Sequence, residues 1–181
     1  MPSPVSHVRH GRPHALVVMW LATYEAATPG VQVADNATVR LDLDNEPQPD
    51  ALLLLDPARG GQARIDHDGY VAGAPELVVE VAASSASYDL HEKLTAYRRN
   101  GVREYIVWRV DDGAIDWFEL RRAEYLLREP DAETLKSPAF PGLWLDPAAL
   151  IRRDGAAVLR RLHEGLASAD HAAFIEGLSP A

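Results

Sequence analysis

The chain has 181 residues, of which 47% are apolar, so it is long enough for one domain with a hydrophobic core and too short for two of ordinary size. It contains no cysteine, which excludes disulfides, thiolate zinc sites and a cysteine nucleophile, so any metal must be bound by oxygen or imidazole ligands. The formal net charge is −9, from 18 basic and 27 acidic residues, which argues against binding of nucleic acid through global charge.

No apolar run has the length of a membrane span. The longest, residues 15–22, is far shorter than the roughly 20 residues of a transmembrane helix. The apolar stretch near the N-terminus has no small-residue cleavage pattern, as a secretion signal would have. We therefore expect a cytoplasmic protein that does not act on a membrane.

The first half of the chain predicts one helix and three strands. Residues 14–27 are apolar almost all round and predict a buried helix, which ends at Thr-Pro-Gly, residues 28–30. After VQVAD, apolar and polar residues alternate over 37–43, as in a half-buried strand. The runs 50–56 and 77–82 predict central strands that are buried on both faces, with a glycine-rich loop between them.

The second half predicts a helix, a hairpin and a helical tail. Asp89 can cap a helix that ends at Gly101, a residue type that adopts a left-handed conformation at low cost. The later elements are a β-hairpin over 103–110 and 114–122, a β segment over 123–130, a helix start at Asp146-Pro147, and amphipathic helices over 155–167 and 170–178.

The predicted order of elements is αβββαβ, followed by a hairpin extension and C-terminal helices. This order fits an α/β fold in which one mixed sheet is flanked by helices. We expect a core domain over residues 1–150 and a helical appendage over residues 151–181.

Two acids in the predicted central strands are candidate metal ligands. Glu80 lies mid-strand among aliphatic residues, where a carboxylate is costly unless it is protonated, paired or bound to a cation. Asp50 opens the other strand, and strands roughly 4.8 Å apart could bring the two carboxylates around one ion. Together with a backbone carbonyl, that of Val81, they would suit Mg²⁺ or Mn²⁺. The alternatives are an ordinary strand-start acid for Asp50 and a buried salt bridge for Glu80.

Lys93 is the third candidate catalytic residue. It borders the apolar stripe of the predicted helix, from which its ammonium group could orient a water or stabilise charge on a phosphate. Alternatively, its stem covers the core and its ammonium group stays in water.

Other polar residues are weaker candidates. Glu25 could lean toward the site, although a solvated helical glutamate is the simpler interpretation, and Asp89 is interpreted as a helix cap. His67 could be a ligand or a phosphate contact, but a loop histidine flanked by Asp66 and Asp68 is more often simply exposed. Most arginines are expected to be solvated rather than to bind a ligand, including the clusters Arg98, Arg99 and Arg103, Arg121 and Arg122, and Arg152, Arg153, Arg160 and Arg161.

Three stretches resemble the Uma-type restriction endonucleases, over roughly residues 5–150. They are PDALLLLD, then the run from APELVVEVAASS to YDLHEKLTAYRRNGVREYIVWRVDDGAIDWFEL, and finally FPGLWL. The resemblance implies a restriction-endonuclease-like fold of the PD-(D/E)XK nuclease superfamily, with Asp50 and Glu80 as metal ligands. Where that motif commonly has lysine, this chain has Ala82, and the resemblance moves the lysine to Lys93 on the following helix.

These observations favour a Mg²⁺-dependent or Mn²⁺-dependent endonuclease that hydrolyses phosphodiester bonds, with DNA as the expected partner and RNA as an alternative substrate. The second hypothesis is a catalytically silent nuclease fold that binds nucleic acid or protein and keeps the acids as a structural pair. A homodimer is also expected, because Val158, Leu159 and Leu162 give the C-terminal helices apolar faces.

Overall fold

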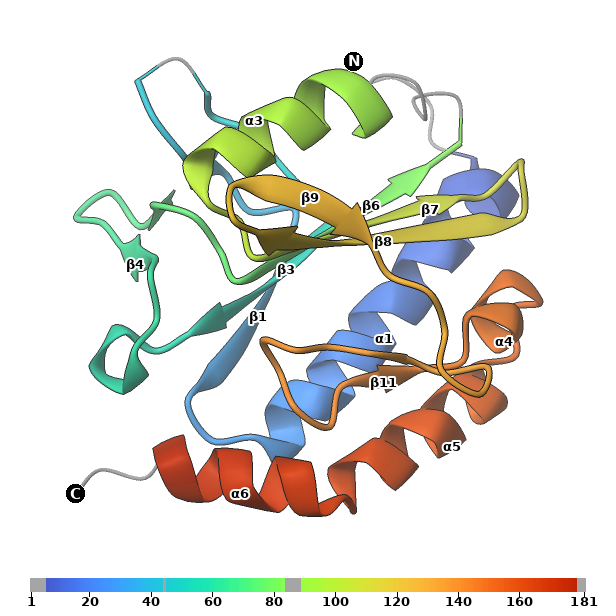
Figure 1. The fold of residues 1–181 in the computed structure, drawn as a ribbon. Coiled ribbons are helices and arrows are strands. Elements are labelled where there is room, and N and C mark those ends of the chain that lie inside the picture. The colour runs from blue at the N-terminus through green and yellow to red at the C-terminus, as the bar shows by residue number, and fades with distance from the viewer. Residues whose placement is uncertain (1–5, 44, 84–88, 179–181) are drawn as a thin grey trace.

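The computed structural model describes residues 6–43, 45–83 and 89–178. Its centre is a six-stranded mixed sheet with helices on both faces (Figure 1). In spatial order the strands are β1 (Val31–Asp35), β3 (Ala51–Leu55), β6 (Leu77–Ala82), β7 (Glu104–Arg109), β8 (Ala114–Arg121) and β9 (Glu124–Leu127). β6 and β7 pair in parallel, and all other neighbours in this sheet are antiparallel. The predicted mixed α/β architecture is confirmed.

Two hydrophobic clusters cover the two faces of this sheet. β3 is buried along its whole length, because Ala51, Leu53 and Leu55 join one cluster while Leu52 and Leu54 join the other. The first face packs against α1 (Arg12–Ala27), α4 (Pro147–Ile151), α5 (Gly155–Leu166) and α6 (Ala169–Leu178). The second face is covered by η3 (Asp89–Lys93) and α3 (Leu94–Asn100), which lie across the sheet from α1 (Figure 1).

Short elements complete the fold. A three-stranded sheet consists of β2 (Val39–Arg40), β5 (Val71–Ala72) and β4 (Arg64–Ile65), and β10 (Leu135–Lys136) pairs with β11 (Trp144–Leu145). A π-helical turn, η1 (His7–Gly11), leads directly into α1, and a 3₁₀ turn, η2 (Pro57–Arg59), follows β3.

The predicted strand over residues 37–43 is wrong. β2 has two residues and lies in the small sheet, and Leu43 is fully exposed. The chain turns back here, because Leu41 N donates to Asn45 O at 3.0 Å and Asn45 Nδ2 donates to Asp42 Oδ1 at 2.6 Å. β1 takes the first strand position instead, so the order αβββαβ is kept.

The C-terminal helices use their apolar faces inside the chain. Val158 and Leu162 of α5 are completely buried in the cluster that α1 shares. These two residues therefore give no support to the expected homodimer, which stays a prediction. Among the described helices, none is both long and apolar enough to cross a membrane.

A buried carboxylate ties the segment after β9 to the sheet. Glu104 of β7 has no exposed surface. Its Oε1 accepts hydrogen bonds from Ser137 Oγ at 2.5 Å and Ala139 N at 2.8 Å, and its Oε2 accepts one from Trp117 Nε1 at 2.6 Å. Burial raises the pKa of Glu104 to about 7 although these hydrogen bonds oppose the shift.

We expect Glu104→Ala to lower the free energy of unfolding by about 3 kcal/mol or more, because two buried donors and a partly buried one lose their acceptor. Urea denaturation measures this loss. Glu129→Ala, at an exposed position, is the control and should stay within about 0.5 kcal/mol of wild type. Equal effects of the two substitutions would contradict a structural role for Glu104.

Candidate functional site

The pairing register places Asp50 and Glu80 opposite each other. β3 and β6 are antiparallel, with Ala51 opposite Val79 and Leu52 opposite Val78, so the next step of this register sets Asp50 against Glu80. Directly opposed residues of antiparallel strands project to the same face of a sheet. That face is the one covered by α3, as the contact between Glu80 and Tyr97 shows. The two predicted acids therefore meet on one face, from neighbouring strands.

Asp50 is held by backbone and imidazole groups. Its Oδ2 accepts a hydrogen bond from Val81 N at 2.6 Å, and its Oδ1 lies 3.3 Å from His10 Nε2. The side chain is 13% exposed, and is therefore mostly shielded but still reachable from solvent. Its backbone carbonyl lies 2.8 Å from His14 Nε2.

Glu80 is bound by groups from the helical segment above it. Its Oε2 lies 2.9 Å from Lys93 Nζ, and its Oε1 accepts a hydrogen bond from Tyr97 Oη at 3.1 Å. Lys93 Nζ also lies 3.0 Å from Asp89 Oδ1. The Lys93 ammonium group is thus directed at two carboxylates. Asp89 is part of this charged group and not simply a helix cap.

Burial controls the protonation of Glu80. It raises the pKa of Glu80 to about 7, the Asp50 charge adds to the rise, and the Lys93 ammonium group opposes it. For Lys93, burial lowers the pKa, but the carboxylates of Glu80 and Asp89 outweigh burial and raise it. Among the described residues, three carboxyl groups, those of Asp50, Glu80 and Asp89, thus lie around one ammonium group, an arrangement that would favour a further cation.

A groove borders this cluster at Lys93 and Tyr97. It has a volume of about 260 Å³ and runs beside α3. Its lining residues are Asn45, Glu46, Pro47, Glu92, Lys93, Ala96 and Tyr97. The Lys93 side chain is 21% exposed, whereas that of Glu80 is 4% exposed. A molecule in this groove would reach Lys93 before Glu80.

Sequence reasoning missed His10, His14 and Tyr97. The two histidines are four residues apart, a spacing that places both on one face of a helix. This spacing was a usable signal, but nothing in the sequence linked that face to Asp50. Glu25 does not join the site: its Oε1 accepts a hydrogen bond from Val33 N at 3.1 Å, near the C-terminal end of α1.

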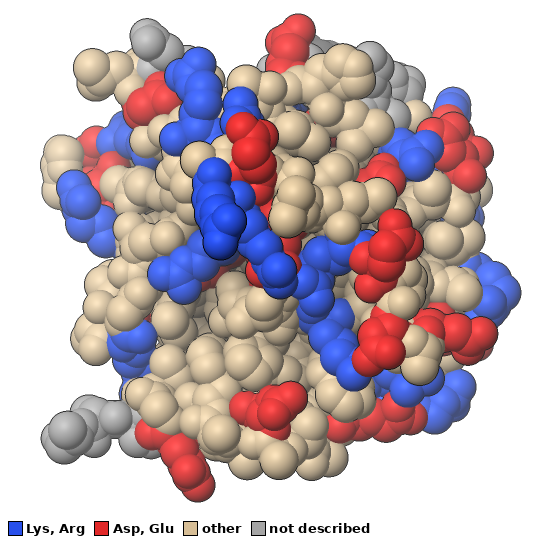
Figure 2. Space-filling model, viewed as in Figure 1, with Lys and Arg blue, Asp and Glu red and all other residues tan. Residues whose placement is uncertain are grey.

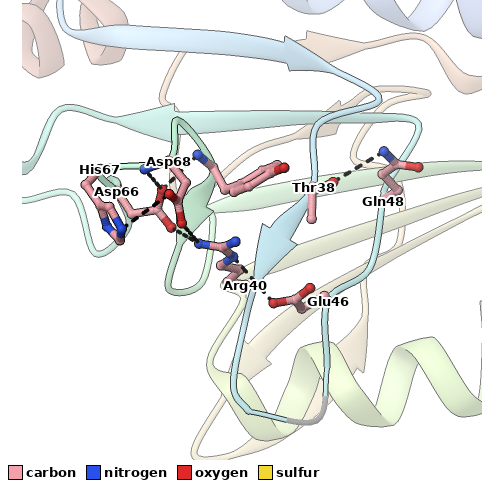
Figure 3. Close-up of polar contacts among 8 residues, drawn as sticks. Thr38, Arg40, Glu46, Gln48, Asp66, His67 and Asp68 are labelled. Carbon is pink, nitrogen blue, oxygen red and sulfur yellow. Dashed lines mark hydrogen bonds and ion pairs between the residues drawn. The ribbon is translucent and has the colours of Figure 1, made fainter.

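A second acidic group lies in the turn between β4 and β5. In the part of the chain that the structure describes, Asp66, His67 and Asp68 are the one set of three metal-ligating side chains whose ligand atoms lie within 4.8 Å of one another. Figure 3 shows both aspartates directed at Arg40. Arg40 Nη1 lies 2.7 Å from Asp66 Oδ2 and 2.9 Å from Asp68 Oδ2. Asp66 Oδ1 also accepts hydrogen bonds from the backbone of Asp68 and Tyr70. An ion-paired turn therefore accounts for this group.

Basic side chains are interspersed with acidic ones on the face shown in Figure 2. Arg98 pairs with Glu124 at 3.0 Å, and Arg121 pairs with Glu119 at 2.8 Å. Much of the charge of these arginines is therefore balanced within the chain, as expected for arginines that are not committed to a ligand.

The donor set around Asp50 fits a hard divalent cation. Two carboxylates come from adjacent strands, and the carbonyl of Val81 lies on the same side as Asp50 and His10. Oxygen ligands of this kind are those that Mg²⁺ and Mn²⁺ prefer. Glu80 faces Lys93 and Tyr97, so ion binding would require its carboxylate to exchange partners.

Comparisons with known proteins agree with this fold. The family described as "Uma2: Putative restriction endonuclease" matches residues 1–148. A crystal structure from Anabaena variabilis ATCC 29413, described as "a putative nuclease belonging to DUF820", is similar with a TM-score of 0.63. The two chains share 12% identity, and the similarity covers 83% of this chain and 84% of that one. No curated protein matches the chain.

The raised pKa of Glu80 predicts a pH-dependent contribution to stability. Between about pH 4.5 and 7 the folded protein binds more protons at Glu80 than the unfolded chain does, so stability from this residue is lost as pH rises through that window. As pH rises through this window, we expect the free energy of unfolding of wild type to fall relative to that of Glu80→Gln, by up to about 1.4 kcal/mol per pH unit. Urea denaturation in the presence of a chelator measures it. A difference that does not change with pH would contradict the assignment.

Proposed function

The chain belongs to the Uma2 family, and from this membership and the paired acids we propose that it is a Mg²⁺-dependent or Mn²⁺-dependent endonuclease that hydrolyses phosphodiester bonds of DNA. The observation that carries the proposal is the register that sets Asp50 opposite Glu80, with Lys93 Nζ 2.9 Å from the Glu80 carboxylate. A buried acid, a second acid and an ammonium group on one face of a sheet supply the groups that metal-assisted hydrolysis requires.

Three groups of this chain would hold the ion. They are the carboxylates of Asp50 and Glu80 and the backbone carbonyl of Val81, which has a second lone pair besides the one that faces His10. When bound, a divalent ion supplies a Lewis acid and lowers the pKa of a coordinated water. The hydrogen bond from Val81 N fixes the orientation of the Asp50 carboxylate. Glu80 would first have to leave Tyr97 or Lys93, which bind its two oxygens.

Lys93 is proposed to contact the scissile phosphate. Its ammonium group is the positive charge of the cluster that borders the groove beside α3. A fixed ammonium group there would stabilise negative charge that develops on phosphate oxygens during hydrolysis. Glu46 and Glu92 line the same groove and disfavour a free anion, so a phosphate would enter as part of a larger, positioned substrate.

The proposal of DNA as the substrate rests on the family and not on surface charge. The net charge of −9 and the paired arginines leave little attraction for a polyanion at long range. Binding must therefore be local and depend on contacts near the groove. RNA shares the phosphodiester chemistry and is separated from DNA by the assay below.

One observation favours the alternative of a silent domain. Glu80, Lys93, Tyr97 and Asp89 form a connected polar group, and a purely structural buried ion pair would have the same contacts. Because breaking a structural pair leaves an uncompensated buried charge, Lys93→Met would then be strongly destabilising and metal would not change stability.

We expect the purified protein to convert supercoiled plasmid DNA to nicked or linear forms when Mg²⁺ or Mn²⁺ is present. Asp50→Ala and Glu80→Ala should each lower the rate at least about a hundredfold, because each removes a ligand of the ion. Lys93→Met should lower the rate while metal binding, measured by calorimetry, is retained. A labelled RNA of the same sequence, assayed in parallel, tests the substrate.

Asp68→Asn is the matched control, because it changes an acid of the exposed group in Figure 3 and leaves Asp50 and Glu80 intact. It should cleave at the wild-type rate. Circular dichroism must show that every variant is folded. Cleavage that survives in folded Glu80→Ala, or loss of cleavage in Asp68→Asn alone, rules out the assignment of the site.

A further inference from the structure

His10 reaches two of the groups that are proposed to bind the ion. It lies in η1, immediately before α1, and its ring is 30% exposed. Its Nδ1 lies 3.2 Å from the carbonyl oxygen of Val81, and its Nε2 lies 3.3 Å from Asp50 Oδ1. A single imidazole from the N-terminal turn therefore bridges groups from two adjacent segments of the sheet.

The hydrogen-bonding chemistry of the ring assigns its nitrogens. A carbonyl oxygen only accepts, so Nδ1 carries the hydrogen that points at Val81. In the neutral ring Nε2 then presents a lone pair to the Asp50 carboxylate. Two electron-rich atoms at this distance repel each other unless a proton or a metal ion lies between them.

The spacing suits a shared ion. Neighbouring ligands of an octahedral ion, each bonded at about 2.1 Å, lie roughly 3 Å apart. The separation of 3.3 Å between His10 Nε2 and Asp50 Oδ1 is close to this value. Histidines that bind metals usually donate their other ring N–H to a carbonyl or carboxylate, as Nδ1 does here.

His14 supports this arrangement without joining it. Its Nε2 lies 2.8 Å from the backbone carbonyl of Asp50 and 2.8 Å from Asp35 Oδ1, and its ring centre is 5.4 Å from that of His10. His14 Nε2 therefore already has two oxygen partners within the chain. His14 holds the start of β3 in place, and His10 is the imidazole directed at the Asp50 side chain.

We propose that His10 Nε2 is a ligand of the divalent ion that Asp50 and Glu80 hold, so that the site has mixed nitrogen and oxygen ligands. His10 then takes the place of the Val81 carbonyl, which accepts the hydrogen bond of Nδ1 at the other end of the ring. This inference rests on the proposed function. Imidazole binds Mn²⁺ and later transition metals better than Mg²⁺. The site therefore selects Mn²⁺ over Mg²⁺ more strongly than an all-oxygen site would.

The test is pulsed electron paramagnetic resonance of Mn²⁺ bound to the full chain, which detects the ¹⁴N nucleus of a coordinated imidazole. Wild type should show ¹⁴N modulation, and His10→Gln should lose it. Glutamine keeps an amide donor for Val81, so this variant should fold even where His10→Ala does not. Calorimetry should show Mn²⁺ affinity falling about tenfold or more in His10→Gln, with a smaller change for Mg²⁺.

Two further variants separate the possible failures. Asp50→Asn should abolish Mn²⁺ binding at the site, and His67→Ala should leave both affinity and ¹⁴N modulation unchanged. If Asp50→Asn loses Mn²⁺ while His10→Gln keeps the modulation, His10 forms only an ion pair with Asp50 and this inference is overturned while the nuclease site stands. If the modulation disappears in His67→Ala instead, the ion lies at Asp66 and Asp68, and both proposals fail.

Discussion

The site depends on the desolvation of one carboxylate. Glu80 is almost completely buried in a strand whose other side chains are aliphatic. Its carboxylate must therefore be protonated, or its negative charge must be compensated by nearby cations. Lys93 provides one positive charge, but Asp50 and Asp89 add two negative ones. The antiparallel register of β3 and β6 creates this imbalance, because it sets Asp50 against Glu80 on the same face. In the proposed function, this gathering of acids is what would make a divalent cation a favourable partner.

The sequence was informative where a single residue violated a strong local pattern. An acid within LVVEVA and an acid at the start of ALLLL are conspicuous, and the buried runs around them fix both the strands and the face on which each acid lies. Lys93 could be placed on that face by helical spacing from Leu90 and Tyr97. These inferences need only the period of a strand or a helix.

The contacts that sequence reasoning missed depend on packing between segments that are distant in the chain. His10 contacts Asp50 only because α1 packs across the sheet and brings its N-terminal turn to the start of β3, a contact between residues 40 positions apart. The strand over 37–43 was wrong because the side chain of Asp42 accepts a hydrogen bond from Asn45 and closes a turn, which alternation of apolar residues does not reveal. Periodicity reports which face is buried, and it does not report which polar atoms meet.

The two acids have different partners, and this difference bears on how the site would bind an ion. Asp50 faces an imidazole and a backbone N–H, whereas Glu80 faces an ammonium group and a phenol. Only the first set includes a nitrogen that can itself become a ligand, since a protonated lysine has no lone pair. Binding on the Asp50 side therefore replaces no ammonium contact, while recruitment of Glu80 requires its ion pair with Lys93 to loosen. That exchange would release the Lys93 ammonium group toward the groove, where a phosphate would be bound.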